Sequence, residues 1–142
     1  MEIKFKKLDP RATAPQKGYP DDAAFDLFAL NETVVEAKSS AWIKTGIAFE
    51  IPEGYAGLIW DKSSVAHKWN ITKIGGVFDA GYRGDITIGL HNLSNESHTF
   101  KSGDKIAQII FAPTPLFELK ESDTLSESVR GEKRFGSSGL RI

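Results

Sequence analysis

Residues 43–51 read Ile-Lys-Thr-Gly-Ile-Ala-Phe-Glu-Ile, so every second side chain lies on one face of an extended segment. Ile86, Ile88 and Leu90 repeat this alternation further along the chain. A period of two is typical of β-strands, because successive side chains of a strand point to opposite faces of its sheet. The chain is therefore predicted to be built from strands.

Short turn signals separate the strand patterns. Only residues 63–69 have the composition of a helix, one or two turns long, with a serine available as the N-cap. Many short strands joined by frequent turns predict an all-β fold, namely a distorted jelly-roll or β-barrel subunit. The turn signals are rich in Gly, Pro, Asn and Asp and fall at 9–10, 18–21, 52–54, 75–76, 79–81, 92–95 and 102–104.

The composition changes after the last strand pattern, which covers residues 107–112 with 116–119 as a candidate extension. Residues 121–142 contain many Ser, Gly and charged residues and few large apolar ones. Burial of such a segment does not offset the entropy lost on ordering it, so we expect a mobile arm that becomes ordered on binding. We therefore divide the chain into a β-barrel domain over 1–120 and an arm over 121–142. A frayed terminus without function is the alternative.

Composition narrows the class of protein. The chain has 142 residues, of which 40% are hydrophobic and 26% charged, as expected for one globular domain. The absence of cysteine excludes disulfide scaffolds, thiol nucleophiles and thiolate metal sites, and it suits a reducing compartment. The formal net charge of -1 gives no overall field for nucleic acid or an anionic membrane. Charges at Glu2, Lys4 and Lys6, and no apolar run of about 18 residues, predict a cytoplasmic protein without a signal peptide or membrane span.

Several common catalytic and binding devices are missing from the sequence. His67, His91 and His98 lack the short spacings of a histidine metal site. No G-x-S-x-G elbow, Walker loop or Rossmann glycine fingerprint is present. We therefore expect neither a histidine metal centre nor the commonest phosphate-binding loops.

Five short segments carry groups that suit a site for a small charged ligand. The second places a cation, two hydroxyls and backbone N–H groups at a helix start, which suits an anion. The fifth combines arginine, glycines, hydroxyls and a ring within the arm, as in a flap over a phosphate-bearing ligand. Each segment alone also fits an ordinary turn, cap or strand end. In chain order they are Ala24-Phe25-Asp26-Leu27, Asp61-Lys62-Ser63-Ser64-Val65-Ala66, Gly76-Val77-Phe78-Asp79-Ala80-Gly81-Tyr82-Arg83-Gly84, Gly103-Asp104-Lys105-Ile106-Ala107-Gln108 and residues 130–139.

In order and spacing, these segments resemble the five motifs of the trimeric deoxyuridine triphosphatases (dUTPases). The family motifs are A-G-x-D-L, a G-R-S-S-like loop, G-x-I-D-x-x-Y-R-G, G-D-R-I-A-Q and R-G-x-G-G-F-G-S-T-G. The resemblance spans nearly the whole chain. It implies a jelly-roll subunit, a homotrimer with active sites shared between subunits, and Mg²⁺-dependent hydrolysis of dUTP to dUMP and pyrophosphate by water attack on the α-phosphorus.

The third motif carries the roles nearest the reaction. By resemblance, Asp79 orients and activates the attacking water. Tyr82 matches the ring that packs against the deoxyribose and leaves no room for a 2′-hydroxyl. The backbone from about Ile74 to Tyr82, including Gly76, matches the hairpin that reads uracil.

The other motifs match phosphate and metal contacts. Asp26 falls where the family anchors a water on Mg²⁺, which is itself held chiefly by phosphate oxygens and water. Arg130 aligns with the γ-phosphate contacts of the arm and Phe135 with the ring that stacks over uracil. The matches to the α- and β-phosphate contacts are Lys62, Ser63, Ser64 and Gln108, and the remaining substrate-binding matches in the arm are Gly136, Ser137 and Ser138.

Three positions depart from the family pattern. Lys62 replaces an arginine and loses its bidentate fork, and the neighbouring Asp61 is expected to compete for its charge. Lys133-Arg134 replaces Gly-Gly before the ring, which reduces flexibility and adds cations. Gly81 replaces a second aspartate, a change that the turn tolerates.

Other functions compete with the triphosphatase. The related dCTP deaminases need a glutamate where this chain has Gly89, so deamination is disfavoured. A nucleotide-sensing regulator that contacts an unknown protein partner is the alternative from another class, and the retained Asp79 argues against a catalytically inactive sensor. An unrelated jelly roll that binds sugars or peptides leaves the five ordered motifs unexplained.

Overall fold

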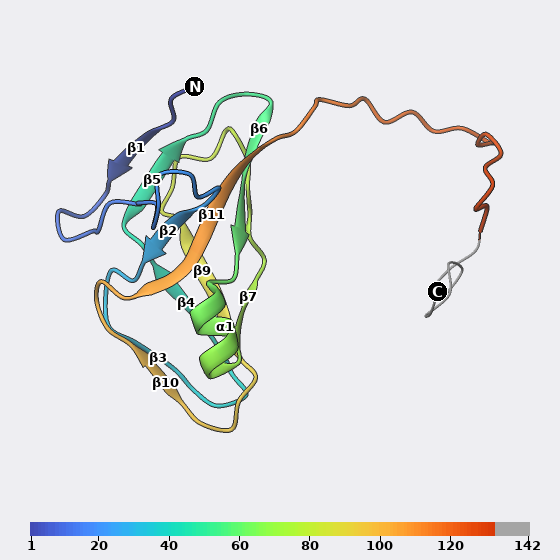
Figure 1. Ribbon diagram of the computed structural model, residues 1–142. Helices are drawn as coiled ribbons and strands as arrows, with labels where there is room; N and C mark the ends of the chain where they lie inside the picture. Colours follow the sequence, from blue (N-terminus) through green and yellow to red (C-terminus); the bar gives the residue numbers. More distant parts are fainter. Residues whose placement is uncertain (133–142) are drawn as a thin grey trace.

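The computed structural model describes residues 1–132, which form eleven strands and one helix. This confirms the all-β class with one short helix (Figure 1). The elements are β1 (Lys4–Lys7), β2 (Phe25–Phe28), β3 (Thr33–Val35), β4 (Ser40–Lys44), β5 (Ile47–Glu50), β6 (Tyr55–Trp60), α1 (Ser63–Trp69), β7 (Ile71–Ile74), β8 (Val77–Phe78), β9 (Thr87–Asn92), β10 (His98–Phe100) and β11 (Lys105–Pro113).

The strands pair antiparallel in four small sheets. The largest has the order β2-β11-β6-β8, and a second has the order β4-β9-β7. Two-stranded ladders join β1 to β5 and β3 to β10. Several paired strands come from distant parts of the sequence, such as β2 with β11 and β4 with β9, so the arrangement of the two larger sheets depends on non-local pairing.

Burial confirms the predicted inward face of both patterns, although the alternation is not strict, because Ala48 and Gly89 on the other face are also buried. Ile43, Ile47, Phe49 and Ile51 are all buried in the core, as are Ile86, Ile88 and Leu90 of the second pattern. The buried hydroxyl of Thr45 donates to the Ile86 carbonyl at 2.9 Å and accepts from the Ile47 N–H at 3.2 Å. The extended stretch is thus two strands, β4 and β5, joined at Gly46, whose φ of 69° and close approach to Ala12 require glycine.

Helix α1 has the predicted bounds but not the predicted cap. The N-cap position is occupied by Lys62, whose side chain makes no capping hydrogen bond. The serine therefore begins the helix as its first residue and does not cap it. Val65 anchors the helix in the core, and Asn70 ends it in the left-handed conformation with φ 54°.

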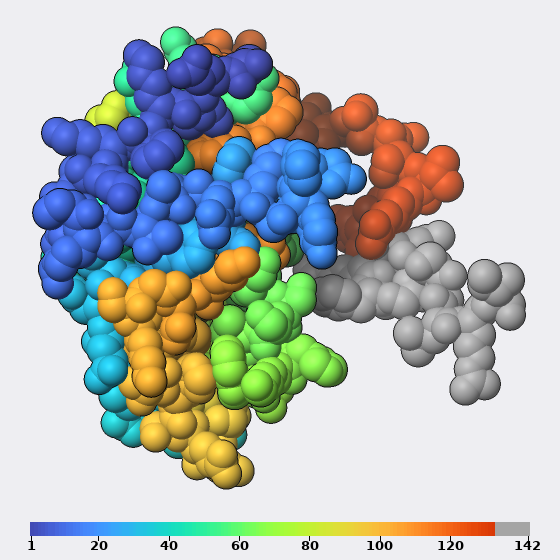
Figure 2. Space-filling view, turned by 60° about the vertical axis from the view of Figure 1, so that its left-hand side comes forward, coloured from blue at the N-terminus to red at the C-terminus, as the bar shows by residue number. Residues whose placement is uncertain are grey.

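Strand β11 is the last regular element of the described chain. It is longer than the predicted 107–112, and its candidate extension over 116–119 is not a strand. Residues 114–132 are exposed and lie to one side of the body in Figures 1 and 2. The division of the chain at residue 120 stays a prediction. No helix within residues 1–132 is long and apolar enough to cross a membrane.

Candidate active site

A pocket of about 350 Å³ opens beside the turn at Gly75 and Gly76, which connects β7 in one sheet to β8 in another. The loop from Asp79 to Asp85 and the middle strand β9 complete its lining. Three predicted site residues, Gly76, Asp79 and Tyr82, are brought together here. The other lining residues are Trp42, Ile59, Ile74, Gly75, Val77, Phe78, Asp85, Thr87, Ile88 and Gly89.

A tight turn places Asp79 and Tyr82 side by side. The Tyr82 N–H donates to the Asp79 carbonyl at 3.0 Å, and the Tyr82 ring lies 5.7 Å from that of Phe78 between centroids. The Tyr82 hydroxyl donates to the Asp85 carbonyl at 3.0 Å. The Tyr82 side chain is therefore positioned by a ring contact with Phe78 and by a hydrogen bond from its hydroxyl. Asp79, in contrast, is exposed to solvent.

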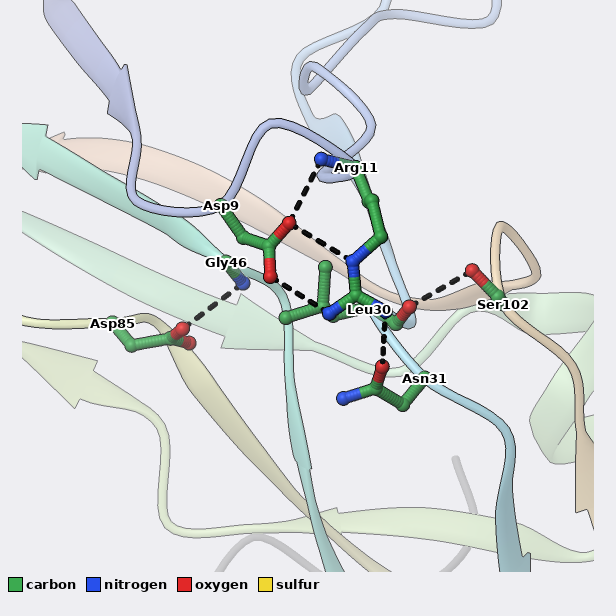
Figure 3. A network of polar contacts seen from close by, with 7 residues as sticks. All are labelled: Asp9, Arg11, Leu30, Asn31, Gly46, Asp85 and Ser102. Atoms are coloured by element: carbon green, nitrogen blue, oxygen red, sulfur yellow. Dashed lines mark hydrogen bonds and ion pairs between the residues drawn. The ribbon is translucent and has the colours of Figure 1, made fainter.

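The end of this loop is fixed by Asp85, a residue that lies outside the five motifs. Its carboxylate accepts from the Gly46 N–H at 3.0 Å and the Thr45 N–H at 3.2 Å. Figure 3 shows the contact with Gly46 next to the ion pair of Arg11 with Asp9. Asp85 thus fastens the loop to the β4–β5 turn. Its position directly after the third motif was the available sequence signal.

The turn between β7 and β8 depends on glycine. Gly75 and Gly76 have φ of 72° and 121°, which L side chains rarely adopt. A Cβ at Gly76 would lie 2.9 Å from the Cβ of Ile59. The Ile59 N–H donates to the Gly76 carbonyl at 2.8 Å, so the backbone of this turn packs directly on β6.

A second group of polar residues is centred on Asp26, on β2. Its buried carboxylate has Lys62 Nζ at 2.7 Å from Oδ1 and Lys105 Nζ at 2.8 Å from Oδ2. The Lys105 contact is an ion pair without hydrogen-bond geometry, so Oδ2 accepts no directed hydrogen bond. Burial alone would raise the pKa of Asp26, but the contacts with Lys105 and Lys62 outweigh it and lower the pKa below its usual value.

Gln108 connects this group to the helix start. It lies on β11 directly across from Asp26 on β2 and Trp60 on β6. Its amide Nε2 donates to the Asp61 carbonyl at 2.8 Å.

Asp61 does not compete for the charge of Lys62, contrary to expectation. Its carboxylate accepts from the Thr72 hydroxyl at 2.8 Å and the Lys73 N–H at 2.6 Å, while Lys62 pairs with Asp26. Folding gives Asp61 donors on β7 that are distant from it in sequence. Asp61 therefore links the start of α1 to β7, the strand that leads into the turn beside the pocket.

The predicted site residues thus form two groups within one chain. The pocket contains Gly76, Asp79 and Tyr82, but neither Lys62 nor Gln108 lines it. Ser63 and Ser64 are exposed in the first turn of α1, and Arg130 is exposed within the arm. Four further predicted residues lie outside the described part of the chain, namely Phe135, Gly136, Ser137 and Ser138.

No ready-made metal cage accompanies these groups. Residues 1–132 contain no cluster of three or more His, Cys, Asp or Glu side chains placed to hold an ion. The histidines are separate, with His91 Nδ1 2.8 Å from the Ser40 hydroxyl and His98 stacked on Trp69.

Known proteins resemble this chain over nearly its whole length. The deoxyuridine 5′-triphosphate nucleotidohydrolase of Tropheryma whipplei (strain Twist) is 41% identical over 142 residues, covering 98% of this chain and 94% of that protein. The enzyme of the same name from Arabidopsis thaliana is 38% identical over 138 residues, covering 97% and 83%.

Solved structures agree with the sequence relatives. The Staphylococcus bacteriophage 80alpha dUTPase, solved with dUPNHPP, has a TM-score of 0.92 at 32% identity and covers 98% of this chain and 99% of that chain. A dUTPase from phage phi11 of S. aureus, described with a structural Mg(II) ion, has a TM-score of 0.82 at 28% identity and covers 87% and 98%. The dUTPase family profile matches residues 10–139. The chain therefore belongs to the dUTPase family.

Proposed function

We propose that this protein hydrolyses dUTP to dUMP and pyrophosphate, with water attacking the α-phosphorus and Mg²⁺ bound to the substrate. The observation that carries the proposal is the pocket in which one tight turn presents both Asp79 and Tyr82. Full-length similarity to enzymes named for this reaction supports it. The products suit a role in limiting dUTP and supplying dUMP in the cytoplasm.

Asp79 is the catalytic residue of the proposal. An exposed carboxylate at the pocket mouth can accept a proton from water and hold that water in line for attack. Tyr82 presents its ring face to the sugar because its hydroxyl is already used by the Asp85 carbonyl. A ribose 2′-hydroxyl pressed against that face would lose water without gaining a partner, which favours deoxyribose.

The group around Asp26 is proposed to bind the phosphates. Lys62, Ser63, Ser64 and Gln108 surround the start of α1, where cationic, hydroxyl and amide donors suit phosphate oxygens. Asp26 with its two lysines carries a net positive charge, which attracts a triphosphate.

The residues present fit a magnesium ion that arrives with the substrate. Asp26 Oδ2 is buried and accepts no directed hydrogen bond, although Lys105 Nζ lies 2.8 Å away, so a metal-bound water would share this oxygen with Lys105. Mg²⁺ dehydrates reluctantly and binds proteins through few carboxylates together with substrate phosphates. When bound, the ion would neutralise phosphate charge.

The arm is proposed to close the site. Arg130 would contact the γ-phosphate together with Gly136, Ser137 and Ser138, and Phe135 would cover the base. In this proposal the β-barrel domain ends at residue 120, and the arm over 121–142 is the part that closes over the substrate.

The separation of the two groups supports a homotrimer with shared active sites. Asp79 and Tyr82 lie in the pocket, whereas Lys62 and Gln108 do not line it. A second copy that brings its helix start to this pocket would complete the site. We propose no nucleic-acid or membrane partner.

A nucleotide-sensing regulator is the second candidate. Structures of the similar 80alpha dUTPase are described under the finding that phage dUTPases control transfer of virulence genes by a proto-oncogenic G protein-like mechanism. A sensor would keep its partner binding in an Asp79→Asn variant. Deamination of dCTP is disfavoured, because Gly89 carries no carboxylate and has no space for one.

The direct test offers dUTP, dCTP, dTTP, dATP and UTP separately to the purified protein with Mg²⁺. Pyrophosphate release is measured for each nucleotide, and ammonia is measured for dCTP. Release from dUTP alone supports the proposal. Failure to act on any nucleotide favours the sensor, and ammonia from dCTP would identify a deaminase.

A further inference from the structure

Trp42 lines the pocket that contains Asp79, although it belongs to none of the five motifs. It lies on β4, and its side chain is 65% exposed. The core is filled by its neighbour Ile43, which points to the opposite face of the strand. Packing of the fold therefore does not account for a tryptophan here.

The register of the second sheet explains how the indole reaches the pocket. Gly89 on the middle strand β9 pairs with Trp42 on β4 and with Ile74 on β7. A Cβ at Gly89 would lie 2.9 Å from Trp42 Cζ3 and 2.7 Å from Ile74 Cγ1. The two side chains thus lie over the glycine from both sides and form a continuous apolar wall.

The rest of the pocket combines apolar side chains with a few polar groups. Asp79 contributes an exposed carboxylate and Gly75 and Gly76 contribute backbone groups, next to apolar side chains such as Val77 and Phe78. A ligand that fits both parts has a flat ring with an apolar face and hydrogen-bonding edges. A pyrimidine nucleoside has this character, since its ring faces are apolar while its edge and its sugar are polar.

Resting on the proposed function, we infer that Trp42 is a nucleoside-binding residue whose indole packs against the pyrimidine ring. The contact is with the nucleoside, so it contributes equally to dUMP and to the triphosphate. A ring face carries little information about base identity, so the contact adds affinity without adding preference for uracil.

The first measurement is the dissociation constant of dUMP and of a non-hydrolysable dUTP analogue, obtained by calorimetry. Trp42→Ala should raise both constants by the same factor, about 3- to 10-fold, the range expected for one lost aromatic contact. Trp42→Phe keeps a ring and should restore most of the affinity. Val34→Ala, an apolar truncation at an exposed position of β3 outside the pocket, is the matched control and should change neither constant.

A second measurement does not depend on affinity. The chain has three tryptophans, so Trp60→Phe combined with Trp69→Phe leaves Trp42 as the sole indole. Saturating dUMP should shift its fluorescence and protect it from acrylamide. This background protein must first show the dUMP affinity of the wild type and an unchanged circular dichroism spectrum.

The outcomes separate the inference from the proposed function. If the folded Trp42→Ala variant binds both nucleotides as well as the wild type, and dUMP leaves the indole unprotected while dUTP is hydrolysed, the inference is overturned and the function stands. A larger effect on the triphosphate than on dUMP would also overturn it. A wild-type protein that neither binds nor hydrolyses dUTP would overturn both.

Discussion

The ammonium group of Lys62 lies 2.7 Å from Oδ1 of Asp26, a carboxylate that is 2% exposed. The cation proposed to bind phosphate is therefore already paired within the chain. Its side chain is 26% exposed and its three donors allow more than one acceptor. Phosphate binding thus requires Lys62 either to share its donors or to leave Asp26 to Lys105.

Lys62→Met should weaken binding of the triphosphate analogue by about tenfold or more, because one charge-assisted contact is lost. The free energy of unfolding should fall by about 1–3 kcal/mol, because Asp26 loses one of its two partners. Calorimetry and urea unfolding measure the two effects. Lys4→Met removes an exposed ion pair with Glu50 and is the control, for which both values should stay near wild type. Unchanged triphosphate affinity would contradict the role given to Lys62.

Asp79→Asn should lower kcat by at least about a hundredfold, the scale of a lost general base, with little change in substrate affinity. The amide keeps the shape of the side chain but does not take the proton from water. Steady-state pyrophosphate release and binding of the analogue are the measurements, and Asp21→Asn, at an exposed position outside the pocket, is the control. Near-normal turnover would refute the assignment of Asp79.

A chain that ends at Val129 should fold with an unchanged melting temperature but lose most of its activity. Its stability should persist because β11 ends at Pro113 and residues 114–132 add no strand or helix to the body. Activity should fall because the residues proposed to close over the substrate are removed. Thermal unfolding and initial rates provide the comparison. A shortened protein as active as the full chain would show that the arm has no part in catalysis.

Gly89→Ala should lower the free energy of unfolding by about 1–3 kcal/mol, the usual cost of overpacking. The added methyl group would lie 3.0 Å from the Ile74 carbonyl oxygen as well as against two side chains, so the backbone of β7 must move. Gly81→Ala adds a methyl group with no atom within 4 Å and is the matched control, with an expected change within about 0.5 kcal/mol. Equal stability of the two variants in urea would contradict the packing described for Gly89.

The free energy of unfolding should decrease between pH 7 and pH 5. Burial lowers the pKa of His98 below 6.5, and the nearby Lys68 adds to this, while Asp104 opposes it. Between the lowered value and about 6.5 the unfolded chain binds a proton that the native protein does not, so stability rises with pH. His98→Phe should reduce this dependence in urea unfolding at the two pH values. His67→Gln, at an exposed position, should keep it.

The sequence predicted those features that depend on local spacing. Burial of Ile43 and Ile88 follows from a period of two, and the bounds of α1 follow from a short helical pattern between turns. The N-cap was missed because the position before Ser63 is held by a residue whose side chain pairs with Asp26, far away in sequence. Local preferences do not report such partners.

Site contacts that join distant strands were missed for the same reason. Trp42 reaches the pocket only because β4 and β7 both pair with β9. The register between strands that are distant in sequence cannot be predicted from the sequence of either strand alone. Lys105 faces Asp26 only after β11 has paired with β2. Motif order identified the residues shared with the family, whereas these contacts required the fold.

The exposed course of residues 114–132 has a consequence for the lifetime of the protein. Proteases bind extended, accessible backbone, and this segment offers it next to Lys120. The last strand ends at Pro113, so one cut within residues 114–132 leaves the folded body whole while separating it from the end of the fifth motif. Because the arm is proposed to close the active site, a single cleavage would abolish that closure without unfolding the protein.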